Sequence, residues 1–143
     1  MSTVTTVAKA VAAELNRHSG FSIPFKAIFT VKPSFDLAEL DTIRVVVVPK
    51  SYEIAQITRA SSKYIATVDI GIMQRIGKMS PEEAVDKLGD LVEEIIEFLK
   101  AQTLADFPAG QVVGITNDPL YVPDHLGQRT FTSALTIQYA MRD

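Results

Sequence analysis

Two stretches of the chain carry apolar residues at helical spacing, and the first spans residues 3–18. Its apolar residues recur every three or four positions among many alanines: Val4, Val7, Val11 and Leu15. This periodicity is typical of a short amphipathic helix. Ser19 and Gly20 follow, and a glycine after a helix often adopts the left-handed conformation that ends it. We therefore expect a helix over residues 3–18 with Gly20 as its left-handed cap.

The second helical stretch, residues 80–102, has the clearer start signal. Ser80 is a favourable N-cap, Pro81 stands at the first helical position, where its missing N–H costs nothing, and Glu83 completes a capping box. A broad apolar stripe suited to packing on a sheet follows: Val85, Leu88, Leu91, Val92, Ile95, Ile96 and Leu99. The pattern predicts one long helix.

The segment between the helices has the composition of β-strands. Residues 25–31 alternate between apolar and polar positions, and Val45–Val48 form a run of four valines. Such a run is typical of a strand that is buried on both faces, so we expect the valines in the central strand. Residues 33–40 should connect these two strands.

Residues 52–77 continue in the style of strands around a polar connector at 58–63. One face of the second strand is apolar: Tyr64, Ala66, Val68, Ile70 and Ile72. Two further strands are expected at residues 111–116 and from residue 130 onward. The order helix, strands, long helix, strands predicts an α+β fold, a mostly antiparallel sheet packed by an N-terminal helix and one long central helix, in a single domain over residues 1–143.

Composition removes several classes of function. The chain has 143 residues, 47% of them hydrophobic and 22% charged, which is typical of a globular protein. The net charge of -3 argues against a basic surface for nucleic-acid phosphates, and the lack of cysteine excludes disulfides and thiolate chemistry. No apolar run approaches the roughly 18 residues of a membrane helix. We expect a soluble protein that is made in the cytoplasm and does not bind membranes.

Three residues near the C-terminal end could form a metal or acid–base site: Asp118, Asp124 and His125. Their spacing lacks the i, i+4 arrangement of helical metal ligands. No nucleophile motif accompanies them, and the glycines are isolated, so no phosphate-binding loop can be assembled. We expect no catalytic residue, metal or cofactor, with a small metal-dependent hydrolase at this cluster as the less favoured alternative.

Residues 117–129 instead have the composition of a docking loop. Pro119 and Pro123 flank Tyr121 and restrict the backbone, and tyrosine and arginine are enriched at interface hot spots. The partner-binding candidates are Asp118, Tyr121, His125 and Arg129. A monomeric adaptor that binds a peptide with this loop is a further alternative.

Two other surfaces are candidates for assembly. An acidic stripe follows the long helix at spacings of four, three and four, namely Asp86, Asp90, Glu93 and Glu97. It is either a solvated helix face or a negative wall that repels DNA phosphates. The second face of the last strand is uncharged and could be a subunit interface: Thr130, Thr132, Thr136 and Gln138.

The order of elements resembles the tail terminator family of long-tailed bacteriophages, the group that includes the lambda minor tail protein U. The N-terminal helix carries the resemblance together with the segments IRVVVVPK (43–50), KYIATVDIGIMQRI (63–76) and RTFTSALTIQYAMRD (129–143). The chain departs from the family in the segments DPLYVPDHLGQR (118–129) and PSFDLAEL (33–40). These departures concern the docking loops.

The resemblance implies a structural virion protein of the tail and neck. Such a protein forms a homohexameric ring on the head-proximal end of the tail tube and stops tube growth. Its partners are further copies of itself, the major tail tube protein and the head-connector or neck protein, while DNA passes through the ring without specific binding. Another phage neck or tail-completion protein is the alternative within this class.

Overall fold

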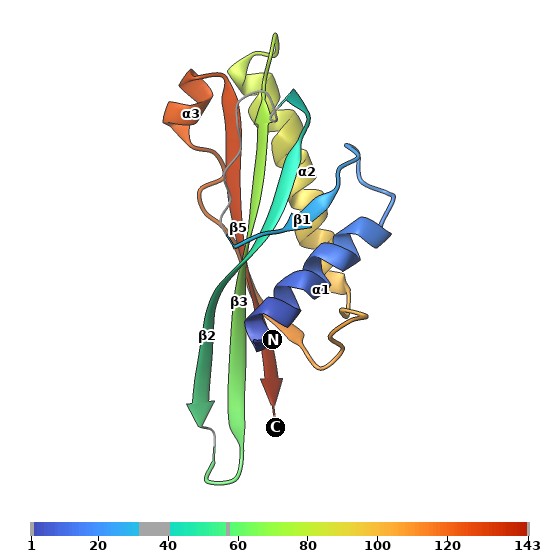
Figure 1. Cartoon of the computed structure of the whole chain (residues 1–143). Coiled ribbons are helices and arrows are strands. Elements are labelled where there is room, and N and C mark those ends of the chain that lie inside the picture. The colour runs from blue at the N-terminus through green and yellow to red at the C-terminus, as the bar shows by residue number, and fades with distance from the viewer. Residues whose placement is uncertain (1, 32–40, 57, 143) are drawn as a thin grey trace.

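The computed structural model describes residues 2–31, 41–56 and 58–142, and these residues form an α+β fold (Figure 1). Its elements in chain order are α1 (Thr3–Arg17), β1 (Ala27–Phe29), β2 (Arg44–Gln56), β3 (Ser62–Arg75), α2 (Pro81–Ala101), β4 (Gln111–Asn117), α3 (Pro123–Gly127) and β5 (Thr130–Arg142). The predicted fold class is confirmed.

The strands form one sheet in the order β1-β2-β3-β5-β4. β1 lies parallel to β2, and the other neighbours are antiparallel. Val45, Val46 and Val47 are buried, as expected. Their prediction as the central strand is wrong, because β3 holds that position. β3 has long partners on both sides, whereas β2 pairs on its outer edge with the three residues of β1.

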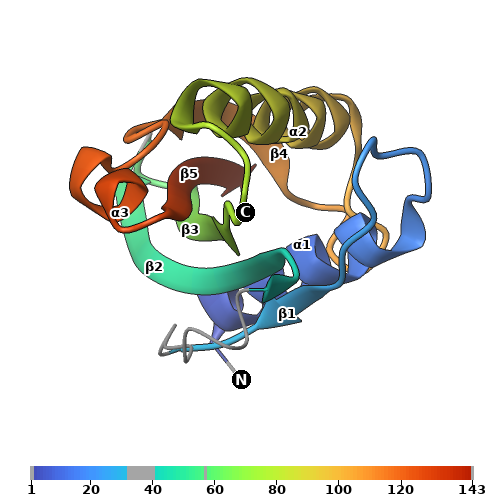
Figure 2. The same cartoon turned by 90° about the horizontal axis from the view of Figure 1, so that it is seen from above.

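Both long helices lie on the same face of the sheet. The sheet curls around them, and α3 lies on the other side (Figure 2). The core face of the strands contributes Val45, Val47, Ala66, Val68, Ile70, Ile72, Phe131, Leu135, Ile137 and Tyr139. The predicted stripe of α2 packs there, with Val85 and Ile96 at its half-buried margins. Burying these apolar side chains is the main source of stability.

The structure confirms the predicted start of α2 but not the predicted end of α1. The Ser80 hydroxyl accepts a hydrogen bond from the Glu83 N–H at 3.2 Å, so the predicted N-cap of α2 is confirmed. The prediction of a left-handed cap at Gly20 is wrong. α1 ends at Arg17 with His18 in an extended conformation, and Gly77 is the described glycine with a positive φ. The His18 ring stacks on Phe98 at 4.4 Å instead, which directs the chain along α2.

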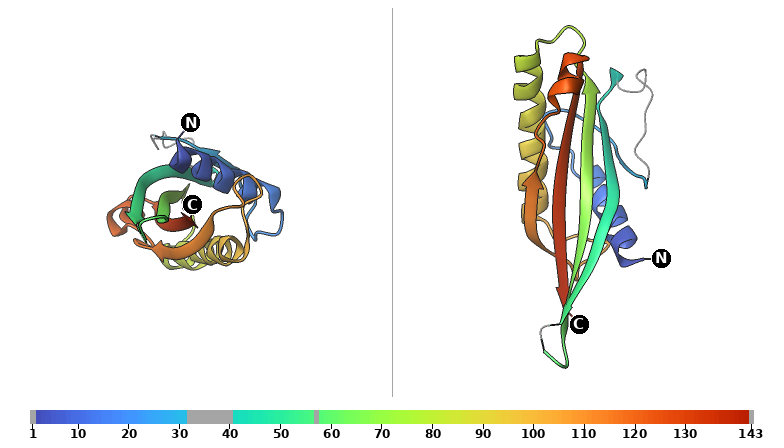
Figure 3. Two further views of the ribbon diagram at one scale, coloured as in Figure 1. Left: turned by 90° about the horizontal axis from the view of Figure 1, so that it is seen from below. Right: turned by 90° about the vertical axis from the view of Figure 1, so that its left-hand side faces the viewer.

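Two strands differ in length from their predictions. β1 covers only the middle of residues 25–31, and the expected connector at 33–40 lies outside the described residues. β2 is longer, because it continues to Gln56 and pairs with the start of β3. The two strands project beyond the helices as a hairpin (Figures 1 and 3). We call residues 50–56 and 58–65 the arm.

Candidate functional site

The loop before β5 is fastened to that strand at its start. The Asn117 side-chain amide donates hydrogen bonds to the Ser133 hydroxyl at 3.0 Å and to the Ala134 carbonyl at 2.8 Å. The Ala134 N–H donates to the Pro119 carbonyl at 3.1 Å, and the peptide bond before Pro119 is cis. This attachment leaves the next residues, Leu120 and Tyr121, at the surface.

A short helix that the sequence reasoning missed follows these residues. α3 begins at Pro123, a residue favoured at the first helical position. The Gln128 N–H closes its last turn by donating to the carbonyls of Asp124 and His125. The expectation of a loop around Pro123 is wrong at this point, and a proline before a polar stretch that ends in glycine is a helix signal that the sequence contains.

Arg129 binds within its own chain. Its Nε donates to the Gly77 carbonyl at 3.1 Å, and its Nη2 donates to the same carbonyl and, at 2.7 Å, to the carbonyl of Met79. Arg129 also has a left-handed backbone, with φ 64°. The side chain thus joins the turn before α2 to the start of β5, and partner binding would compete with these bonds.

Replacing Arg129 with alanine is expected to lower the free energy of unfolding by about 1–2 kcal/mol, because two carbonyls lose a charged donor. Urea unfolding followed by circular dichroism measures this change. Arg129→Lys is the matched control, since a lysine keeps the charge but cannot span both carbonyls in the same way. An unchanged midpoint for Arg129→Ala would show that the guanidinium does not stabilise the turn.

The structure does not assemble Asp118, Asp124 and His125 into a metal site. The Nδ1 atom of His125 lies 3.0 Å from the Thr132 hydroxyl, a contact between α3 and β5. Within residues 2–31, 41–56 and 58–142, no group of three histidine, aspartate or glutamate side chains is arranged to hold a metal ion. The geometry therefore gives the hydrolase alternative no support.

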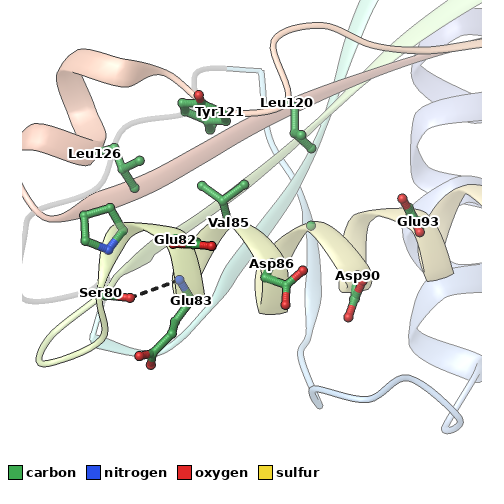
Figure 4. A pocket seen from close by; sticks show the side chains of 12 residues that line it. Ser80, Glu82, Glu83, Val85, Asp86, Asp90, Glu93, Leu120, Tyr121 and Leu126 are labelled. Atoms are coloured by element: carbon green, nitrogen blue, oxygen red, sulfur yellow. Dashed lines mark hydrogen bonds between the residues drawn. The ribbon is translucent and has the colours of Figure 1, made fainter.

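A groove of about 820 Å³ separates the first half of α2 from the loop (Figure 4). Its apolar side chains face one another from the two elements: Val85, Leu120, Tyr121 and Leu126. The helix adds five carboxylates along the groove, those of Glu82, Glu83, Asp86, Asp90 and Glu93. We call this site the acidic groove. It combines an apolar lining with strong negative charge, and its lining residues include no lysine or arginine.

The acidic groove brings together two sets of residues that were predicted separately. Tyr121, a candidate from the loop, is 37% exposed and lines the same groove as Asp86 and Asp90 from the acidic stripe. Glu93 also lines the groove, and Glu97, one helical turn further on, is exposed. The sequence does not predict that Tyr121 and the acidic stripe line one groove, because this depends on how the loop folds over α2.

The uncharged face of β5 is the sheet face that α1 and α2 leave open. Thr132, Thr136 and Gln138 are half-buried there, whereas Thr130 is buried at 9% exposure. The Thr136 hydroxyl donates to Asp69 at 2.7 Å, and Lys50 lies 3.7 Å from the same carboxylate. The Asp69 charge is therefore balanced locally, and β5 presents small polar side chains on this face.

Two polar groups near the core have structural roles. The Glu14 carboxylate is buried and accepts hydrogen bonds from the Ala105 N–H at 2.7 Å and from Arg17 at 3.2 Å. Arg17 also donates to both oxygens of Asp106, and this pairing raises the pKa of its guanidinium.

The Tyr139 hydroxyl is buried and has no hydrogen-bond partner among the described residues. Its burial, and then the charge of Glu14, raise the pKa of Tyr139.

No family model matches the chain, and no curated protein matches it. None of the helices in the described part of the chain is long and apolar enough to cross a membrane. Function must therefore be argued from the surfaces themselves.

Proposed function

We propose that the protein is a structural subunit that forms a ring and caps a phage tail as a tail terminator. The observation that carries the proposal is the arm, in which every described side chain from residue 50 to residue 56 is exposed, including Tyr52 and Ile54. A projecting ribbon with exposed apolar residues is a surface made for contact with another protein. The choice of a tail terminator rests on the order of elements, which resembles that of the tail terminator family.

The other surfaces support an assembly rather than a reaction centre. The open sheet face carries the polar side chains of Thr132, Thr136 and Gln138, and the acidic groove provides a second, different patch. Rings built from repeated head-to-tail contacts need two different complementary patches on each subunit. The proposed partners are further copies of the chain, the tail tube protein and a head-connector or neck protein, with no cofactor.

The charge of the chain suits a ring through which DNA passes. The net charge is -3, and Asp86, Asp90, Glu93 and Glu97 are exposed along α2. A negative wall repels phosphates, so DNA would pass without being held. We propose that the part of this acidic stripe outside intersubunit contacts faces the channel.

The test is electron microscopy of tail tubes incubated with gold-labelled protein. We expect gold at one end of each tube and no further lengthening of capped tubes when tube protein is added, because the ring covers the growing end. Label along the whole tube, or growth that continues from labelled ends, would contradict the terminator function. Label on the neck of assembled heads but not on tubes would favour the alternative of another neck protein.

A further inference from the structure

The arm continues the core face of the sheet beyond the helices that cover it. Register pairs Tyr52 with Ala66 and Ile54 with Tyr64, so all four side chains point to the face on which Ala66 belongs to the core. The exposed fraction is 0% at Ala66 but 62% at Ile54. The change occurs because α1 and α2 end before they reach the arm (Figures 1 and 3).

Contacts between described residues brace the arm in its middle and at its tip. The Tyr52 and Tyr64 rings lie 6.1 Å apart and nearly parallel, at 17°. At the tip, the Thr58 hydroxyl accepts hydrogen bonds from the N–H groups of Ala60 and Ser61 at 3.2 and 3.1 Å. On its other side, the β3 part of the arm pairs with the end of β5, Tyr64 with Met141 and Ile65 with Ala140. A pre-shaped ribbon also loses less entropy when a partner covers it.

The arm is the basic part of an acidic chain. Residues 50–65 contain Lys50, Arg59 and Lys63 against the single acid Glu53, which gives three positive charges minus one, a net +2, while the whole chain carries -3. Arg59 stands at the tip and is exposed. A partner surface for the arm therefore needs apolar contacts for Tyr52 and Ile54 and negative charge for the tip.

The acidic groove has both properties. Its five carboxylates face no lysine or arginine among the lining residues, and Leu120 and Tyr121 are 40% and 37% exposed beside them. The groove lies at the α3 end of the molecule, and the arm extends from the opposite end (Figure 1). An arm therefore cannot reach the groove of its own chain, but it can reach the groove of a second copy.

We infer that the arm of one copy docks in the acidic groove of the next copy. Tyr52 and Ile54 pack against Leu120 and Tyr121, and Arg59 lies among the carboxylates of α2. The contact joins two different patches, so its repetition generates a closed ring or an open filament. The inference rests on the ring-forming function proposed above and names the contact that builds the ring.

A mixing experiment tests this contact directly. The arm variant combines Ile54→Ser with Arg59→Gln, and the groove variant combines Leu120→Ser with Asp86→Lys. Wild-type protein should self-associate with rising concentration in size-exclusion chromatography with light scattering. Each variant alone should be monomeric, with association weakened at least about tenfold. An equimolar mixture should form a one-to-one heterodimer, because one intact arm and one intact groove remain.

The control variant carries changes of the same chemistry elsewhere, Val113→Ser on β4 and Glu97→Lys on α2. Both side chains are exposed and lie outside the groove lining, so this variant should assemble like the wild type. Thermal unfolding of all variants checks that each is folded. A variant that unfolds is replaced by the single change Arg59→Gln or Asp86→Lys, to which the same expectations apply.

Three results would overturn the inference: a wild type that stays monomeric at its highest soluble concentration, an arm variant that assembles like the wild type, or a mixture that stays monomeric. Failure of the proposed function looks different. Heterodimers formed by arm and groove without capping of tail tubes would remove the tail terminator function and keep the contact. If an arm variant still forms rings and caps tail tubes, the tail terminator function stands and the arm–groove contact is wrong.

Discussion

Replacing Phe131 with alanine is expected to lower the free energy of unfolding by about 3–5 kcal/mol. Phe131 lies on β5 with 0% exposure, within the core between the sheet and the helices. Alanine removes most of the apolar side chain and leaves a cavity that the surrounding side chains fill only in part. Because domains are stable by about 5–15 kcal/mol, this one change removes a large share of the total. Urea unfolding followed by circular dichroism measures it.

The matched control is Val113→Ala on the neighbouring strand β4. Val113 is 49% exposed, so its truncation should change the unfolding free energy by no more than about 0.5 kcal/mol. The two variants separate the effect of core volume from that of losing apolar atoms on a strand. If Phe131→Ala shifts the urea midpoint no further than Val113→Ala, the core described for β5 is wrong.

Replacing Glu14 with alanine is expected to cost about 2–3 kcal/mol, the scale of hydrogen bonds that involve a charged group. The buried carboxylate joins α1 to the segment after α2 through the Ala105 N–H, and it holds Arg17 beside Asp106. Without it the Ala105 N–H loses its acceptor. The same unfolding measurement, made near neutral pH, gives the change.

Glu14→Gln provides the comparison for this prediction. Glutamine keeps an acceptor oxygen for the Ala105 N–H and loses only the charge, so it should cost clearly less than alanine. An equal loss in both variants would mean that charge pairing with Arg17, not the bond to the backbone, holds the two segments together. No loss in either variant would contradict the described contact.

The elements with strong local signals could be predicted from the sequence. Ser80 and Pro81 determine the start of α2 whatever the helix packs on, because capping involves only the first turn. The alternation along β5 also determines its buried face, with Phe131 and Leu135 inside and Thr132 outside. These are short-range effects, and the fold class follows from their order along the chain.

The roles of candidate residues whose partners lie far away in the sequence could not be predicted from local patterns. Arg129 has the residue type of an interface hot spot, but its guanidinium binds the carbonyls of Gly77 and Met79, which lie about fifty positions earlier. Tyr121 was chosen for its chemistry alone. Its place in the same groove as the carboxylates of α2 depends on the attachment of the loop to β5 through Asn117.

The arm shows most clearly which features follow from the local sequence and which depend on the tertiary structure. The sequence by itself predicted strand character on both sides of a polar connector at residues 58–63, because alternation and turn chemistry are local properties. Only the tertiary structure decided that the same sheet face is buried at Ala66 and exposed at Ile54. The physical reason is the length and placement of α1 and α2, which cover the sheet up to the arm and leave Tyr52 and Ile54 exposed.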